Sequence, residues 1–495
     1  MSSDGGENAM ANSLPELEQR VRADLACLCL PPANWVAPVK PAGDTPVHDV
    51  VVIGGGMCGL VASFALQNAG IRNLRIFDRA PKGLEGPWLT YARMETLRSP
   101  KQLTGPAYGM ASLTFRAWFV AQFGDEEWDA LDKIPRPMWM DYLRWYRAVL
   151  DLPVENNVEV ARIRPEGETL RLDLAGEGRG EDFVLTRRVI MATGRDGMGR
   201  PNLPDFVQGV ARKHWAHSSD MIDFASLKGK RVVVVGVGAS AVDNAAEALE
   251  AGAAEVRMLA RRPQMPTINK LMGIGSYGFA AAFPDMGDDW RWRIMQYSFQ
   301  TQTPAPRGST LRVSRHTNAY FHFNAAVERV DVAGDELRIV TPSGVLETDY
   351  LILGTGFVVD PLARTELDGY ADKIALWKDR YQPPAGLENW QLGLFPYLND
   401  DFSFTERTSG DAPWLSRIHS FNYGASVSLG KTSGDIPGIS EGANWLARSL
   451  ASHFYREDIE QHWSRLLAYE TPELKGDEWT PSDLPQASGK KRGAV

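Results

Sequence analysis

Residues 51–60 read Val51-Val52-Ile53-Gly54-Gly55-Gly56-Met57-Cys58-Gly59-Leu60, and this stretch decides the fold. An apolar run over residues 49–53 stops at the glycines, and an alanine-rich helical pattern follows over residues 60–68. In a strand–turn–helix of this G-x-G-x-x-G form, Gly54 makes the turn, Gly56 lets a pyrophosphate approach the backbone, and Gly59 lets helix and strand pack closely. The helix N-terminus presents N–H groups and partial positive charge to phosphates. The stretch therefore predicts a dinucleotide-binding unit.

An acidic residue at the right distance strengthens this interpretation. Asp78 stands nineteen residues past Gly59, at the end of the next apolar run over residues 74–77. A carboxylate at this point of a βαβ unit binds ribose hydroxyls.

A second unit of the same kind begins at residue 231. A run of valines leads into Gly236-Val237-Gly238-Ala239-Ser240-Ala241 and then a helical pattern over residues 242–249. After the next strand, residues 255–259, Arg261 stands twenty residues past Ala241, with Arg262 beside it. Two guanidinium groups at this position suit a 2′-phosphate rather than a free ribose. The acid in the first unit and the arginines in the second predict FAD in the first and NADPH in the second.

Two further turns of small residues are expected to lie against cofactor. One is Ala192-Thr193-Gly194 after a strand over residues 188–192, and the other is Leu353-Gly354-Thr355-Gly356-Phe357. We expect one to leave the first domain and the other to return to it. Asp435 precedes a helix whose N-terminus could face a flavin carbonyl.

Composition limits the alternatives. A chain of 495 residues with a net charge of −9 suggests two or three domains and argues against nucleic-acid or general membrane-surface partners. Three cysteines and a polar, acidic N-terminus fit a reducing, cytoplasmic setting without a secretory signal. The eight histidines show no metal-ligand spacing, so no metal site is predicted.

These patterns predict an α/β protein with two Rossmann-like domains, the first one discontinuous around the second. The expected parts are an N-terminal helical segment and linker (1–47), the FAD domain (48–227 and 348–470), the NADPH domain (228–347) and a disordered tail (471–495). Residues 263–320 have no clean period, and we interpret them as an insertion near the substrate entrance.

The order of these parts resembles the class B flavoprotein monooxygenases, which include flavin-containing, N-hydroxylating and Baeyer–Villiger enzymes. The resemblance covers residues 48–455 and rests on the two glycine motifs with Asp78 and Arg261, the two small-residue turns, and Gly86-Pro87-Trp88. It implies that Trp88 lies near the flavin. It also implies that NADPH reduces FAD, that O2 adds at flavin C4a, and that retained NADP+ protects the peroxide. One oxygen atom then goes to a small organic substrate and the other to water.

The linker before the second domain departs from the family pattern. His217-Ser218 is similar to the family's His-Ser step, but Phe206, Gly209 and His214 are wrongly spaced for the Baeyer–Villiger fingerprint. Hydroxylation of a nitrogen or another soft centre is therefore favoured. Baeyer–Villiger oxidation of a ketone, or an NADPH-dependent flavin oxidoreductase or oxidase, remains the alternative.

Three residues are candidates for roles near the reacting flavin edge: Ser99, Lys101 and His217. Each has an ordinary alternative, as a loop cap, a solvent-facing lysine and a linker histidine respectively. The expected partners are a small-molecule substrate and O2, without nucleic acid or stable membrane insertion, and a homodimer is left open.

Overall fold

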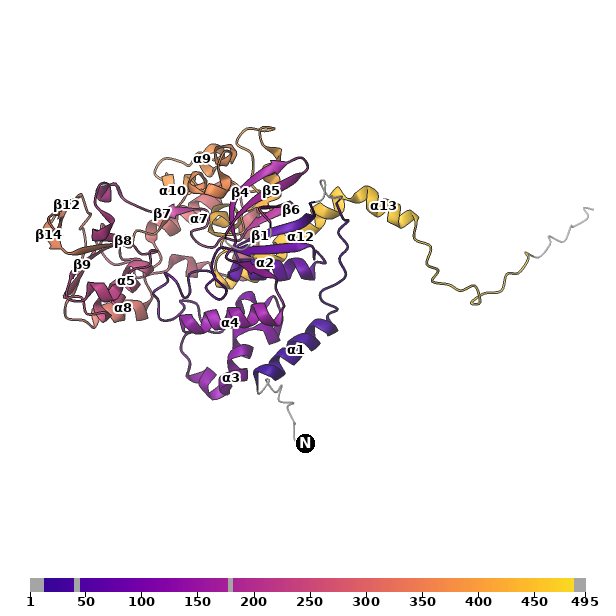
Figure 1. The fold of residues 1–495 in the computed structure, drawn as a ribbon, viewed down its shortest axis with the longest axis horizontal. Helices are drawn as coiled ribbons and strands as arrows, with labels where there is room; N and C mark the ends of the chain where they lie inside the picture. Colours follow the sequence, from indigo (N-terminus) through magenta and orange to yellow (C-terminus); the bar gives the residue numbers. More distant parts are fainter. Residues whose placement is uncertain (1–12, 40–44, 177–180, 485–495) are drawn as a thin grey trace, which may run out of the picture.

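The computed structural model describes residues 13–39, 45–176 and 181–484. The first twelve residues of the predicted N-terminal segment, and residues 485–495 of the tail predicted to be disordered, lie outside these ranges. Figure 1 shows two lobes, one around β1 (Val47–Ile53) and α2 (Met57–Asn68) and the other around β9 (Arg231–Val235) and α5 (Ala239–Glu250). Residues 468–484 reach away from both lobes.

The first lobe is built on a seven-stranded sheet of order β3-β2-β1-β6-β5-β4, with β17 also paired to β6. The central strand β1 lies parallel to β2 and β6, with Val52 opposite Ile76 and Ile190, and all three side chains are buried. The strands are β1 (Val47–Ile53), β2 (Leu74–Asp78), β3 (Val154–Asn156), β4 (Glu159–Glu166), β5 (Thr169–Ala175), β6 (Phe183–Met191) and β17 (Ile418–His419).

The second lobe is built on a five-stranded parallel sheet of order β11-β10-β9-β15-β8. Its strands are β8 (Trp215–His217), β9 (Arg231–Val235), β10 (Glu255–Leu259), β11 (Ala319–His322) and β15 (Tyr350–Leu353). The parallel strands of this sheet, and those around β1 in the first sheet, where β4 and β5 add antiparallel pairs, confirm the predicted fold class. Since β8 and β15 belong to this sheet, it extends past the expected range of 228–347 at both ends.

Two short strands connect the lobes. β7 (Gly199–Pro201) leaves the first lobe and pairs antiparallel with β16 (Phe357–Val359), which returns to it. The first lobe is therefore discontinuous, and the two connections follow the two small-residue turns. The expected meander is the antiparallel sheet β12 (Arg329–Ala333), β13 (Glu336–Thr341) and β14 (Gly344–Thr348).

Helices cover the sheets and the space between them. The helix α1 (Leu14–Cys27) begins after the N-cap Ser13, whose hydroxyl accepts a hydrogen bond from the Glu16 backbone N–H at 3.4 Å. The other longer helices are α2 (Met57–Asn68), α3 (Phe115–Ala130), α4 (Arg136–Val149), α5 (Ala239–Glu250), α7 (Asp288–Thr301), α12 (Ile439–Glu457) and α13 (Ile459–Leu467). Among the described residues, no helix is both long and apolar enough to cross a membrane.

The insertion at residues 263–320 joins the two lobes. It contains α6 (Tyr277–Ala282), α7, α8 (Arg307–Ser314) and finally β11. Phe283, Trp292 and Met295 are buried in the hydrophobic core of the first lobe, whereas Val313 of α8 is buried in the core of the second. Hydrophobic burial on both sides holds the insertion across the space between the nucleotide units.

Candidate cofactor and substrate site

The first glycine turn is shaped by close backbone contacts. Gly54 has φ +105°, and a Cβ there would lie 2.5 Å from the Ala192 carbonyl oxygen. A Cβ on Gly59 would lie 1.8 Å from the Gly54 oxygen. No side chain fits at either position, so both glycines are needed to bring β1, α2 and the end of β6 together.

Gly56, in contrast, faces open space. Its nearest neighbours would be the N and Cα of Gly86, at 3.8 and 3.9 Å. Gly56 is also the N-cap of α2 and provides no side-chain cap, which leaves the first N–H groups of the helix available to a phosphate. A cavity of about 290 Å³ lies beside Gly55 and Gly56, between the loop at Lys82 and helix α4. These features fit a nucleotide diphosphate.

Asp78 closes the first turn from the end of β2. Its carboxylate accepts hydrogen bonds from the backbone N–H groups of Gly55 and Ala80, both at 2.7 Å. Burial raises the pKa of this carboxyl, and the two backbone bonds oppose that shift. Each carboxylate oxygen has a second lone pair, so ribose hydroxyls can still be bound.

The loop with Gly86 and Trp88 is held beside the turn by buried polar contacts. Glu85 accepts hydrogen bonds from Arg147 at 2.8 Å and from the Gly83 N–H at 2.8 Å. The Arg136 guanidinium donates to the Trp88 carbonyl, and the Trp88 ring meets Trp139 edge-on at 6.3 Å. The loop is thus fixed next to the space that Gly56 leaves open.

The second glycine turn has the same form as the first, except that alanine replaces glycine at the third motif position. Gly236 has φ +113°, and a Cβ there would lie 2.6 Å from the Gly354 oxygen. The third position carries Ala241, and here Gly354 supplies the missing space, because a Cβ on Gly354 would lie 2.4 Å from that of Ala241. Gly238 caps α5 without a side-chain bond, and Ser240 is exposed in the first helical turn.

Arg261 and Arg262 differ in whether their guanidinium groups are already bound by other residues. Arg261 is exposed, and its guanidinium has no hydrogen-bond or ion-pair partner in the described ranges. Arg262 donates to the Gln300 carbonyl at 2.8 Å, and burial together with Arg261 lowers its pKa. The geometry favours Arg261 as the reader of a 2′-phosphate and gives Arg262 a contact to the insertion.

The two small-residue turns are tied to the rest of the site by hydrogen bonds. Thr193 donates to the Gly197 carbonyl at 2.9 Å and accepts from Asn422 at 3.3 Å, while Gly194 has φ +79°. In the other turn, Thr355 donates to the Asn202 carbonyl at 2.5 Å. Gly356 in that turn has φ +76°.

His217 lies under the second of these turns. Its Nε2 is 2.9 Å from the Gly356 carbonyl oxygen and its Nδ1 is 2.7 Å from the Ser219 hydroxyl. Burial lowers its pKa, and the contact to Gly356 opposes that shift. Because both ring nitrogens are engaged, the contacts support a positioning role at the connection between the lobes.

Asp435 and the start of α12 lie near the first unit. The carboxylate of Asp435 contributes to raising the pKa of the Cys58 thiol to about 12, behind the larger effect of burial. Asp435 is half-buried, with Lys431 at 3.8 Å. Its carboxylate thus lies close enough to the first turn of α2 to influence Cys58, and its role beside a cofactor stays a prediction.

The side chains of Ser99 and Lys101, which lie in the same loop, have different surroundings. Ser99 is half-buried, and its hydroxyl has no hydrogen-bond partner within the described part of the chain. Lys101 is buried, and its ammonium donates to the carbonyls of Trp128 and Asp129 at the end of α3. These contacts account for a buried lysine structurally, so of the two only Ser99 keeps a side chain free for a ligand.

Three residues at the site were not predicted from the sequence. Gln302, with φ +58°, places its Nε2 3.2 Å from where a Cβ on Gly238 would be. Arg195 directly follows Gly194, and its guanidinium lies 4.5 Å from the centre of the Tyr423 ring. No sequence signal could have indicated these contacts in advance, since Tyr423 and Gln302 reach the site from distant parts of the chain.

The sequence matches one protein-family profile over part of its length and one known protein over nearly all of it. Residues 51–272 match the profile of the family described as pyridine nucleotide-disulphide oxidoreductase. An FAD-dependent urate hydroxylase from Xanthomonas campestris pv. campestris is 39% identical over 468 residues, which cover 94% of this chain and 98% of that protein.

Solved structures share the fold at lower identity. The reduced form of ornithine hydroxylase from Pseudomonas aeruginosa superposes with a TM-score of 0.63 at 18% identity, covering 82% of this chain and 99% of that one. L-lysine 6-monooxygenase from Pseudomonas syringae gives 0.61 at 18% identity, covering 83% and 99%.

Proposed function

Because the chain belongs to the class B flavoprotein monooxygenases, we propose that its substrate is an electron-rich, anionic nitrogen heterocycle of the urate class. The enzyme is an NADPH- and O2-dependent flavin monooxygenase that uses FAD. The observation that carries the substrate proposal is the 39% identity to a urate hydroxylase along nearly the whole of both chains.

Each of the two glycine turns is proposed to bind a different cofactor. The first turn, with Gly56 and Asp78, would hold FAD, and the second turn, with Gly238 and Arg261, would hold NADPH. Reduced FAD, when bound, supplies the activated oxygen for transfer. The protein's own task is to orient the substrate, to keep water out and to keep the nicotinamide nucleotide in place.

Arg195 is our candidate for binding the substrate's negative charge. It stands next to the Gly194 turn, its guanidinium has no hydrogen-bond or ion-pair partner in the described residues, and Tyr423 provides an aromatic face beside it. The Tyr423 backbone N–H donates to the Gly194 carbonyl at 3.2 Å, which fixes the two side chains near each other. A guanidinium favours an anionic oxopurine over a cationic amine such as ornithine or lysine.

The test is a substrate assay on the FAD-loaded protein. Urate is expected to accelerate NADPH oxidation and to gain one oxygen atom from isotopically labelled O2, as measured by product mass. Ornithine, lysine and cyclic ketones are expected to be poor substrates. Ketones converted to esters with urate inert would restore the Baeyer–Villiger alternative, and peroxide release under every condition would indicate an oxidase.

A matched pair of variants tests the role of Arg195. Arg195→Ala should raise the KM for urate about 10- to 100-fold, because a charge-assisted hydrogen bond contributes roughly 1.5–3 kcal/mol. Arg200→Ala removes an exposed arginine from the same segment, one that is paired with Asp360 at 3.4 Å, and should leave KM unchanged. Equal effects of both variants would remove Arg195 from the proposed site.

We also propose a reducing, cytoplasmic setting and revised domain limits. Cys27, Cys29 and Cys58 are all free thiols, which supports that setting. The second domain is proposed to begin with β8 and to end with β15, because both strands lie in its sheet.

A further inference from the structure

The C-terminal helix α13 carries an apolar face on the surface of the protein. Ile459, Trp463, Leu466 and Leu467 recur at the spacing that places side chains on one side of a helix. No residue of α13 is buried, and Trp463 and Leu467 are 55% and 66% exposed. A contiguous apolar face of this kind usually marks an interaction surface.

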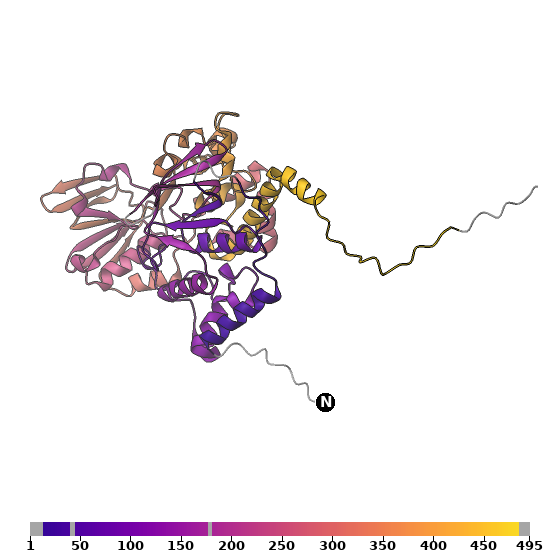
Figure 2. The same ribbon diagram turned by 45° about the vertical axis from the view of Figure 1, so that its right-hand side comes forward.

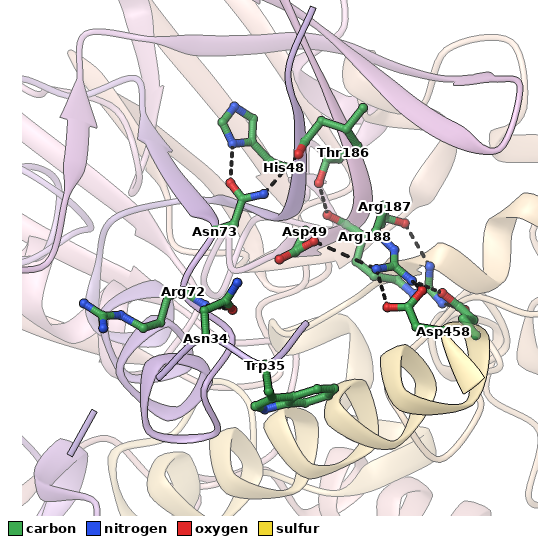
Figure 3. A network of polar contacts seen from close by, with 12 residues as sticks. Asn34, Trp35, His48, Asp49, Arg72, Asn73, Thr186, Arg187, Arg188 and Asp458 are labelled. Atoms are coloured by element: carbon green, nitrogen blue, oxygen red, sulfur yellow. Dashed lines mark hydrogen bonds and ion pairs between the residues drawn. The ribbon is translucent and has the colours of Figure 1, made fainter. Parts of the chain in front are cut away.

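Buried ion pairs fix the direction of this helix. Arg187, on the central strand β6 of the first sheet, donates to both carboxylate oxygens of Asp458 at 2.9 and 3.0 Å (Figure 3). It also donates to Glu457 at 3.1 Å. Arg188 also pairs with Glu457, and the side chains of Arg187 and Asp458 are both buried. The corner between α12 and α13 is therefore anchored, and α13 lies against the linker through His462, whose ring is 6.1 Å from that of Trp35.

The residues after α13, 468–484, continue away from both lobes (Figures 1 and 2). This C-terminal segment exposes Tyr469, Leu474, Trp479 and Leu484. It contains five acidic residues and one lysine. A local turn precedes Trp479, because the Glu478 carboxylate accepts hydrogen bonds from the backbone N–H groups of Lys475 and Gly476, both at 2.9 Å.

A groove of about 950 Å³ runs along the outward face of α12. Arg448 and Arg456 line it from α12, and Trp445 adds a half-buried aromatic surface. Arg291 of the groove is already paired with Asp288, and Asp401 accepts hydrogen bonds from Ser403 and lies 3.6 Å from His453. Arg448 and Arg456 have no carboxylate partner in the described residues, although Asp400 and Glu441 also line the groove. These two arginines and the Trp445 ring can therefore contact an acidic, aromatic segment.

We propose that the occupant is a second copy of this chain. The α13 faces of two copies pack on each other, and the C-terminal segment of each copy lies in the α12 groove of the other. Such an isologous arrangement forms every contact twice. The segment is long enough, since its residues extended span about 55 Å, whereas the part of α12 that lines the groove is about 23 Å long. A segment folded back on its own chain would leave the α13 face exposed.

The test measures the mass of the FAD-loaded full chain by light scattering. We expect twice the chain mass of 54.7 kDa for the wild type and a single-chain mass for Trp463→Glu combined with Leu467→Glu. Trp390→Glu is the matched control, because Trp390 is 67% exposed on α10 (Trp390–Gly393), and it should remain a dimer. All variants should keep FAD and NADPH oxidation, which separates lost association from misfolding and from the proposed substrate.

A second pair of changes tests the groove. Arg448→Glu with Arg456→Glu should weaken dimerisation by about tenfold or more, because the exposed acidic segment would then face like charge. A single-chain mass for the wild type overturns the proposal, as does a dimer that Trp463→Glu with Leu467→Glu leaves intact. A dimer that the two arginine changes leave unaffected overturns the placement of the segment in the groove.

Discussion

The two nucleotide units use the same backbone turn with different side chains. In both, the first glycine has a positive φ and donates its N–H to the end of the next strand, Gly54 to the Phe77 carbonyl at 2.7 Å and Gly236 to Leu259 at 2.8 Å. They differ at the third motif position and at the end of that next strand. We propose that the shared backbone turn binds phosphate in both units, and that the residue after the next strand selects the nucleotide.

The difference at the third position shows that one packing problem has two solutions. In the first unit, Gly59 itself is small, because the Gly54 oxygen lies directly against it. In the second, Ala241 is tolerated because Gly354, which directly follows the neighbouring strand β15, has no side chain. A motif is therefore best judged together with the strand that lies next to it.

The largest expected effect comes from substitutions at the third motif position, which should affect the two units very differently. Gly59→Ala should prevent formation of the holoenzyme, since its Cβ would lie 1.8 Å from a backbone oxygen that cannot move without opening the turn. Ala241→Gly should cost only about 1 kcal/mol, the usual helix penalty of glycine. Thermal unfolding and FAD content of the two purified variants decide this, and a stable yellow Gly59→Ala protein would contradict the packing account.

The next largest effect should distinguish the FAD site from the NADPH site. Gly56→Leu should fold but lose FAD, because the leucine would fill space that the protein leaves open for the ligand. Gly238→Leu should keep FAD but block its reduction by NADPH, while dithionite still reduces it. Absorbance spectra before and after each reductant measure both outcomes. Retention of FAD by Gly56→Leu would mean that the first turn is not the flavin site, and loss of both functions in both variants would indicate misfolding.

The smallest expected effect concerns pH. Burial lowers the pKa of His217 in the folded protein, so below the usual histidine pKa the unfolded chain binds a proton that the folded one does not. This residue therefore costs stability as the pH falls below about 6.5. His217→Gln should reduce the loss of Tm between pH 7 and pH 5, measured by calorimetry. His214→Gln, a change three residues earlier in the chain, is the control, and equal changes in both would contradict the assignment.

The fold was predictable because its main elements repeat simple local patterns. Two valine-rich strands, each ending in a glycine motif, and an Asp or Arg at a fixed distance were enough for both Rossmann units and for the discontinuous first domain. Short strands could not be predicted in this way. β8 and β17 have three and two residues and depend on neighbours that are remote in sequence.

The candidate site was only partly predictable, because the spacing of residues in the sequence does not determine where a loop side chain points. Lys101 was predicted to lie near the flavin, but its ammonium donates to two carbonyls at the end of α3, a contact that the neighbouring sequence does not indicate. Gln302 reaches the second turn from an insertion without periodicity. Such contacts arise from how the two lobes and the insertion pack, so they are apparent only in three dimensions.

The central claim is that opposite charges at matched positions assign the two nucleotides, and anaerobic rapid mixing tests it most directly. The rate of FAD reduction is measured with NADPH and with NADH for the wild type, Arg261→Ala and, as the control, Arg262→Ala, whose guanidinium is already engaged with the Gln300 carbonyl. The wild type should strongly prefer NADPH. Arg261→Ala should lose about 10- to 100-fold of that preference, through a higher NADPH KM with little change for NADH, and Arg262→Ala should lose less. An unchanged preference in Arg261→Ala would contradict the account, and a larger loss in Arg262→Ala would transfer the role to that residue.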